Sequence, residues 1–104
     1  MKQLTIVVKP FRAEAVLQTI AGLEVVACVV REAKGYSRQK GYLDRYAGSE
    51  YSMAFLPKVE ISVWVHDEQA EEVADRIAKT ARTGRIGDGK IFVVEMGWPD
   101  VIEF

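Results

Sequence analysis

The sequence predicts an α+β fold: a ferredoxin-like βαββαβ sandwich, with two helices on one face of a four-stranded antiparallel sheet. The first observation is the order of the segments, which is β-α-β, a long loop, and β-α-β again. The second is the length of 104 residues, typical of a single domain over 1–104. The third is residues 58–66, where apolar and polar side chains alternate as in a half-buried strand.

The first half of the chain contains a strand, a helix and a second strand. Residues 3–9 are rich in β-branched side chains and predict a strand. Pro10 ends it, because proline cannot donate to the ladder. Residues 12–21 carry apolar side chains at helical spacing, and Gly22 marks the helix end. A second β-rich run covers residues 24–34.

The second half repeats this order after the long loop. The alternation over 58–66 predicts a strand, and Asp67 is a plausible N-cap for the following helix. A glycine-rich segment then leads into a last strand over 90–96. The helix has a single apolar stripe, formed by Ala70, Val73, Ala74, Ile77 and Ala81.

Two of the strands are apolar on both faces, although two helices can cover only one face of the sheet. The other face therefore needs a second cover, and in so short a chain we expect this cover to be another copy. The sequence thus predicts a homo-oligomer. The alternating sets are Val25, Ala27 and Val29 against Val26, Cys28 and Val30, and Ile91 and Val93 against Phe92, Val94 and Met96.

Composition excludes several classes of protein. The net charge is −1, which favours neither a nucleic-acid binder nor a membrane-surface binder. No apolar run approaches the roughly 20 residues needed to span a bilayer, and the first residues lack the pattern of a signal peptide. The lone Cys28 fits a reducing cytoplasm, and we expect it to be a small core residue. With His66 as the one histidine, a protein-held metal cluster is not expected.

The glycine-rich loop over 82–90 has three glycines between Arg82 and Lys90. Glycine permits positive φ, so successive N–H groups can turn inward as a nest for an anion, and the lysine adds a point charge. The segment is no P-loop, because Ile91 stands where Ser or Thr is needed and a helix precedes it. The alternative is an ordinary glycine-rich turn between helix and strand.

The long loop over 36–55 is too long to be a simple connection in a small domain. It mixes basic side chains with tyrosines, which are the residues that anchor protein interfaces. Asp44 and Glu50 dilute its charge, and no nucleic-acid recognition motif accompanies it. We therefore predict a protein-docking loop, with a solvated insertion as the alternative.

Four segments, in order along the chain, closely resemble the PII nitrogen-regulatory signal proteins. They are Val8-Lys9-Pro10-Phe11, residues 34–41 (KGYSRQKG), the pair 48–51 (GSEY) and 55–59 (FLPKV), and residues 81–92 (ARTGRIGDGKIF). The resemblance implies a cytoplasmic trimer that regulates nitrogen metabolism and is not an enzyme. It implies ATP or ADP in each inter-subunit cleft, Mg²⁺ with ATP, and 2-oxoglutarate as an effector. It also implies that the long loop controls an ammonium channel or other transporter, a metabolic enzyme or a transcriptional regulator.

The resemblance further assigns roles to single residues of this chain. Gln39 is the expected Mg²⁺ ligand, Tyr51 matches a tyrosine uridylylated in many members, and Ser49 matches a serine phosphorylated in others. The expected 2-oxoglutarate residues are Gln39, Lys40, Gly41 and Lys58. The expected nucleotide-binding residues are Gly35, Tyr36, Ser37, Arg38, Gln39, Ser62, Trp64, Arg82, Thr83, Gly84, Gly87, Asp88, Gly89 and Lys90.

This chain departs from the family pattern around the nucleotide. Val29 and Ser62 stand where the family usually has a threonine and an acidic residue, and Trp64 replaces a smaller aliphatic side chain. At residues 101–103, Val-Ile-Glu replaces the usual Arg-x-Arg, which favours ADP or AMP as rivals of ATP. The alternative is that the tail leads elsewhere and that Arg31, Arg82 or Arg85 compensates. One alternative is therefore a PII-like adaptor that regulates a membrane transporter with altered or lost ligand binding. A phosphate-handling enzyme is disfavoured, because no nucleophile–base pair accompanies the glycine loop.

Overall fold

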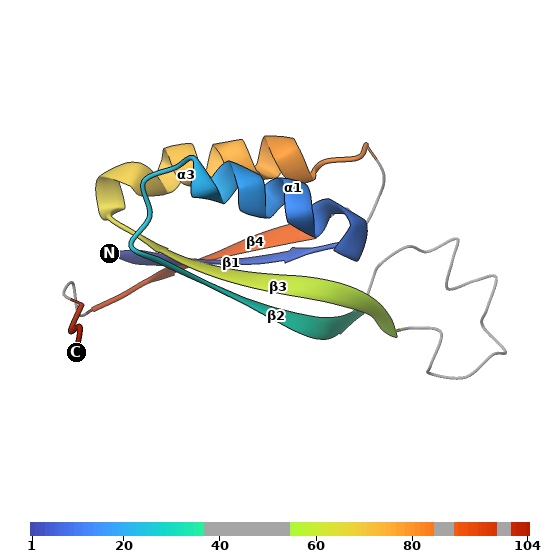
Figure 1. Ribbon diagram of the computed structural model, residues 1–104, viewed down its shortest axis with the longest axis horizontal. Coiled ribbons are helices and arrows are strands. Elements are labelled where there is room, and N and C mark those ends of the chain that lie inside the picture. The colour runs from blue at the N-terminus through green and yellow to red at the C-terminus, as the bar shows by residue number, and fades with distance from the viewer. Residues whose placement is uncertain (37–54, 85–88, 98–100) are drawn as a thin grey trace, which may run out of the picture.

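The structure is a computed structural model that describes residues 1–36, 55–84, 89–97 and 101–104. Its elements are β1 (Lys2–Val8), α1 (Pro10–Ala21), β2 (Ala27–Tyr36), β3 (Phe55–Val65), α3 (Asp67–Ala81) and β4 (Gly89–Glu95). Figure 1 shows both helices lying in one layer above the sheet.

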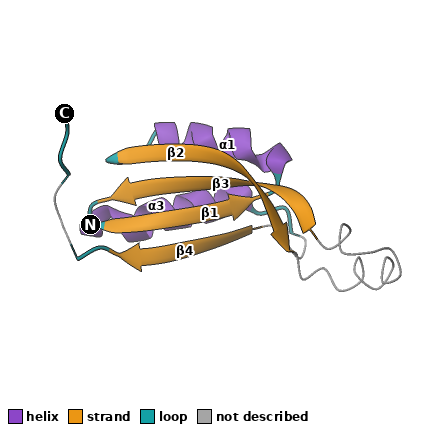
Figure 2. Cartoon of the chain, turned by 90° about the horizontal axis from the view of Figure 1, so that it is seen from below, coloured by secondary structure: helices purple, strands orange, loops and turns teal. Residues whose placement is uncertain are grey.

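The four strands form one antiparallel sheet in the order β2-β3-β1-β4, which is visible face-on in Figure 2. β1 lies inside the sheet, and it pairs with β3 and with β4 along its whole length. This order confirms the predicted ferredoxin-like fold. β2 and β4 are the two edge strands.

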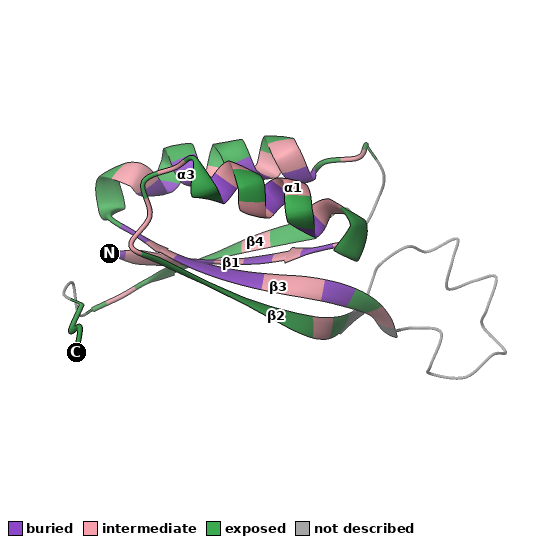
Figure 3. Ribbon diagram, in the orientation of Figure 1, coloured by how far each residue is buried: buried purple, intermediate pink, exposed green. Residues whose placement is uncertain are grey.

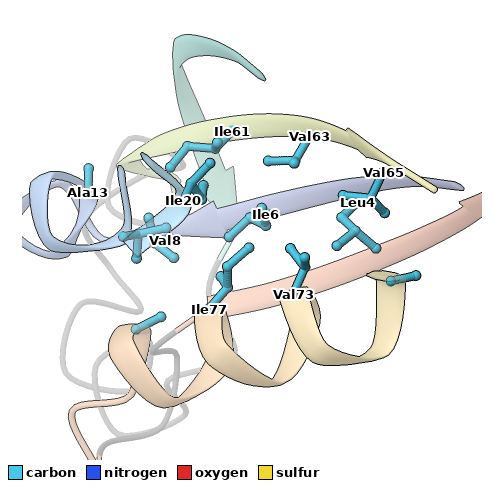
Figure 4. Packing of buried hydrophobic residues seen from close by; sticks show 13 residues of the cluster. Leu4, Ile6, Val8, Ala13, Ile20, Ile61, Val63, Val65, Val73 and Ile77 are labelled. Carbon is cyan, nitrogen blue, oxygen red and sulfur yellow. The ribbon is translucent and has the colours of Figure 1, made fainter. Parts of the chain in front are cut away.

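The core lies between the sheet and the helices (Figure 4). Leu4, Ile6 and Val8 of β1 point to this side and are essentially inaccessible. α1 packs along α3, and α3 lies over β1 and β4, which confirms the predicted apolar stripe of α3. The buried partners of β1 from the other elements are Ala13, Val16, Ile20, Ile61, Val63, Val65, Ala70, Val73, Ile77 and Ala81.

Both helices begin differently from the prediction. α1 begins at Pro10, because proline fits the first helical position, where no N–H partner is needed. In α3 the N-cap is His66, and Asp67 is the first helical residue rather than the cap. The Asp67 carboxylate instead lies 2.9 Å from the ammonium group of Met1, and this hydrogen bond lowers its pKa. Gly22 ends α1 as predicted, with its N–H donating to Thr19.

The β2–β3 ribbon reaches further towards the long loop than the sequence indicates. Its last pairs join Gly35 to Leu56 and Tyr36 to Phe55, so the ends of the predicted loop belong to the sheet. At its other end β2 begins only at Ala27, three residues later than predicted. Residues 37–54 of the predicted loop lie outside the described residues.

Within the described residues, no helix lies over the face of the sheet away from α1 and α3, here called the open face (Figure 3). Val29 on β2 and Phe92 and Val94 on β4 point to it and keep 44%, 51% and 49% of their surface exposed. The register confirms that β2 and β4 carry apolar side chains on both faces. The prediction that the open face is covered by another copy stays a prediction.

The expectation that Cys28 lies in the core is wrong. The register places it on the helix side of edge strand β2, where it is exposed. The helices make their main sheet contacts with β1, β3 and β4, so their cover stops short of this edge. Partial burial still raises the pKa of the Cys28 thiol, which makes it a poor nucleophile.

Neither helix in the described part of the chain is long and apolar enough to cross a lipid bilayer.

Removing core contacts of α1 should destabilise the fold strongly. Ile20 is 3% exposed beneath the helix, and Ile20→Ala leaves a cavity, so we expect the free energy of unfolding to fall by about 2–5 kcal/mol. Gln18→Ala on the exposed side of the same helix should change it by less than about 0.5 kcal/mol. Urea unfolding at one fixed protein concentration measures both. Equal losses for the two variants would contradict the described core.

Candidate functional site

The predicted site residues divide into those that the structure describes and those that it does not. Described are Gly35, Tyr36, Lys58, Ser62, Trp64, Arg82, Thr83, Gly84, Gly89 and Lys90. Outside the described residues lie Ser37, Arg38, Gln39, Lys40, Gly41, Ser49, Tyr51, Gly87 and Asp88. The roles predicted for the second group stay predictions.

The entrance to the glycine loop is fixed by the end of α3. The Thr80 hydroxyl lies 2.9 Å from that of Thr19 on α1, and the Arg12 guanidinium donates to the Thr80 carbonyl oxygen. Arg82 follows as the C-cap, with its N–H donating to Ala78, and its side chain is exposed. Gly84 has a φ of +84°, a conformation that L side chains rarely adopt. The two helices therefore hold the start of the loop in place.

The exit from the glycine loop is fixed by close packing against β1. A Cβ atom on Gly89 would lie 2.6 Å from the carbonyl oxygen of Val7, so no side chain fits there. This contact sets the start of β4. The next residue, Lys90, pairs with Val7, lies on the open face and is exposed.

A pocket of about 180 Å³ lies beneath this loop, on the helix side of the sheet. Its floor is apolar, and Arg82 and Lys90 are the basic residues among the described residues that line it. Pockets that enclose drug-sized ligands usually measure about 300–1,000 Å³, so this one is too small for a nucleotide.

The open face has two chemically different ends. Facing side chains form rows across the strands, because residues paired in a sheet point to the same side. The row nearest the loops is Arg31–Glu60–Val7–Lys90. The next two are Val29–Ser62–Thr5–Phe92 and Ala27–Trp64–Gln3–Val94. The loop end is therefore charged, and the far end is apolar and aromatic.

Lys58 lies at the loop end and lines an open pocket of about 730 Å³. Only 8% of its surface is exposed. Burial, aided by the nearby charge of Lys9, lowers the pKa of the Lys58 ammonium group. The pocket is lined by Pro10, Glu32, Ala33, Lys34, Pro57, Lys58 and Val59, so its lining includes two lysines and one glutamate.

The residues that depart from the PII pattern lie on or beyond the open face. Ser62 is only 3% exposed although the register places it on the open face, whereas Trp64 is half-buried. Glu103 and its apolar neighbours are exposed at the C-terminal end of the chain. Figures 1 and 2 show that this end of the chain and the N-terminus both lie towards the end of the sheet opposite the tip of the β2–β3 ribbon.

Glu60 was not among the predicted site residues, and Arg31 was named only as one of three arginines that could compensate for the missing basic pair. The alternation over 58–66 already places Glu60 on the same face as Ser62 and Trp64. The position of Arg31 follows only from the pairing of β2 with β3, which the sequence does not reveal.

The chain matches known regulatory proteins over almost its whole length. The family model of the nitrogen regulatory protein P-II matches residues 1–102. The chain is 48% identical to the nitrogen regulatory protein GlnK of Escherichia coli (strain K12) over 96 residues, which are 92% of this chain and 86% of the relative. Over the same shares it is 43% identical to the nitrogen regulatory protein P-II 1 of that organism and 41% identical to the nitrogen regulatory protein P-II of Pasteurella multocida.

The chain therefore belongs to the nitrogen regulatory protein P-II family. Members of this family are regulatory signal proteins and not enzymes, as the sequence predicted.

The close contact of Gly89 with β1 should make this position intolerant of any side chain. We expect Gly89→Ala to lower the free energy of unfolding by roughly 1–3 kcal/mol, because β4 must move away from Val7. Gly97→Ala is the matched control, since its Cβ would meet nothing within 4 Å. Urea unfolding compares the two variants. Equal stabilities would show that the contact does not constrain the loop.

Proposed function

We propose that this chain is a regulator of nitrogen metabolism that binds an adenine nucleotide on its open face and signals through its long loop. The observation that carries the proposal is the two-ended open face, with Lys90 at its charged end and Trp64 and Phe92 beyond it. A nucleotide has the same two ends, an anionic phosphate chain and a flat, mostly apolar base. Membership of the P-II family supports this proposal.

The phosphate end of the nucleotide would be held by the glycine loop. Lys90 and Arg82 are exposed on either side of it, and no ion pair occupies either side chain within the described residues. We assign Gly84, Gly89 and the predicted residues Gly87 and Asp88 to the same phosphate site. Thr83 completes the proposed set on this loop, and Arg38, Ser37 and Gln39 complete it from the long loop.

The base would lie towards Trp64. Aromatic rings stack favourably on flat π-systems, and the small Ala27 lies directly opposite this tryptophan on β2. The buried Ser62 hydroxyl gives less polar recognition than an acidic side chain would. We therefore propose a site that holds the base mainly by stacking, with Gly35 and Tyr36 of β2 at its loop end.

Lys58 supports 2-oxoglutarate as a second ligand. Its ammonium group is buried beside a pocket, close to the charge of Lys9. We propose that it pairs with a carboxylate of 2-oxoglutarate, with Lys40, Gly41 and a Mg²⁺ ion on Gln39 completing the site when ATP is bound. Such a site couples the two ligands, typically by about 1–3 kcal/mol.

The open face also supports a proposal for how copies of this chain assemble and how they contact target proteins. Val29, Phe92 and Val94 are half exposed on a strand-edge surface that a second copy would cover. We propose a cytoplasmic homotrimer with the nucleotide between copies. Its loop over 36–55 would dock on an ammonium channel or other transporter, a metabolic enzyme or a transcriptional regulator, and Tyr51 or Ser49 would be the modified residue.

A second candidate is an adaptor that docks on a membrane transporter with altered or lost ligand binding. It is favoured by the exposed tail, which presents Val101, Ile102 and Glu103 and lacks the basic pair of the family pattern. The two candidates differ in whether an adenine nucleotide binds at all.

Nucleotide binding should depend on Lys90. We expect ATP, ADP or AMP to bind in calorimetric titrations with and without Mg²⁺. In Lys90→Ala, the affinity for the preferred nucleotide should fall roughly tenfold or more. Lys2→Ala, at the other end of the sheet, should bind as the wild type does. The absence of heat with every nucleotide would reject the leading candidate in favour of the adaptor. Unchanged affinity in Lys90→Ala would reject the phosphate site.

Binding of 2-oxoglutarate should depend on Lys58, and the folded state should not. In Lys58→Met we expect 2-oxoglutarate titrated into the Mg-ATP complex to give no measurable heat. Methionine is also a long, unbranched side chain, so we expect Lys58→Met to stay folded, which urea unfolding checks.

The matched control for Lys58→Met is Lys79→Met, which removes an exposed lysine from α3. It should leave 2-oxoglutarate binding unchanged. Binding retained in Lys58→Met would rule out the proposed carboxylate contact.

A further inference from the structure

We propose that Arg31 is a phosphate-binding residue, supplied from the β2 edge of one copy to the nucleotide held by Lys90 of the neighbouring copy. This inference rests on the proposed function, because it requires both the nucleotide and the assembly of copies. It adds a residue that the resemblance to the P-II family did not assign.

The first argument is position. Arg31 and Lys90 belong to one row of the open face, and each lies on an edge strand, β2 and β4 respectively. Neighbouring strands are about 4.8 Å apart, so three spacings separate the two Cα atoms by about 14 Å within one copy. Within one copy the two side chains could therefore meet at one phosphate group only by extending towards each other over Glu60 and Val7.

The second argument is the closure of a ring. In a cyclic assembly the contact is head-to-tail, so one surface of a copy meets a different surface of the next. The two edges of the open face carry the exposed apolar side chains, Val29 at the β2 edge and Phe92 and Val94 at the β4 edge. If these edges meet, Arg31 and Lys90 come together, because they occupy the same height along their strands.

The third argument is charge. Arg31 is exposed, and no ion pair of the described residues includes its guanidinium, although Glu60 is its partner in the register. A guanidinium carries a forked set of donors that fits two phosphate oxygens. The exposed tail of this chain carries Glu103 and no basic residue over 101–104. Arg31 is thus a cation at the charged end of the open face that can replace a missing basic contact.

The carboxylate of Glu60 weakens the attraction between Arg31 and a phosphate group. It lies between Arg31 and Val7 in the row and places a negative charge beside the arginine. A ligand with fewer phosphate charges is repelled less by this carboxylate. The row still carries two cations against this one carboxylate, so its net charge attracts a phosphate group.

Titration of the intact protein with ADP tests the contribution of Arg31. We expect Arg31→Gln to weaken the binding of ADP roughly tenfold or more. Arg76→Gln, on the exposed side of α3, should leave the affinity for ADP unchanged. The loss in Arg31→Gln should shrink at high salt. Adenosine, which has no phosphate, should bind both variants equally. Equal ADP affinities of the two variants would overturn the proposal while leaving the proposed function intact.

Mixed assemblies test whether Arg31 acts across copies. Each of Arg31→Gln and Lys90→Ala is impaired alone, so co-purified assemblies that contain both should regain a fraction of sites with wild-type ADP affinity. Such sites arise only where an intact Lys90 on one copy meets an intact Arg31 on the next. If no site in the mixed assemblies regains wild-type ADP affinity, the proposal that Arg31 contacts a nucleotide held by the neighbouring copy is overturned. Absence of ADP binding by the wild type would instead reject the proposed function itself.

Discussion

The burial of one face of the sheet by two helices is the constraint on which the rest of this molecule depends. Along β1, Leu4, Ile6 and Val8 enter the core completely, while the alternate residues point to the open face. Each fully buried aliphatic side chain contributes roughly 1.5–3 kcal/mol, so the helix side supplies most of the stability of a small domain. The open face is thereby released from the need to form a core within one chain.

The placement of the glycine loop is a consequence of that packing. α3 is held on the sheet by Val73 and Ile77 and tied to α1 through Thr80, so its last residue is fixed relative to β1. At Gly89 the chain enters the sheet again as β4, in close contact with the backbone of Val7. The loop therefore connects two rigid points, and Lys90 takes its position from the core rather than from the loop. This is how a stable layer of helices positions a charged group on the opposite face.

The pattern of faces could be predicted from the sequence, because alternation has a fixed period of two. Val59, Ile61 and Val63 could be assigned to one side of β3 without any structure, and the structure agrees. What could not be predicted depends on register and on the reach of the helices. Cys28 is exposed because α1 and α3 do not extend over β2, and the role of Asp67 depends on the position of Met1. Arg31 and Glu60 become one row only through the pairing of β2 with β3.

The same separation explains how the chemistry of the site can change while the fold stays constant. Val29, Ser62 and Trp64 all depart from the pattern expected for this family, and all three point to the open face. None of them contributes to the core between the sheet and the helices, where Ile61 and Val63 occupy the alternate positions of the same strand. Substitutions on the open face therefore alter polarity, stacking and charge at little cost to the stability of one chain. Under the proposed function, their cost falls on the binding of the ligand and of the neighbouring copy, so ligand preference and assembly are expected to change together.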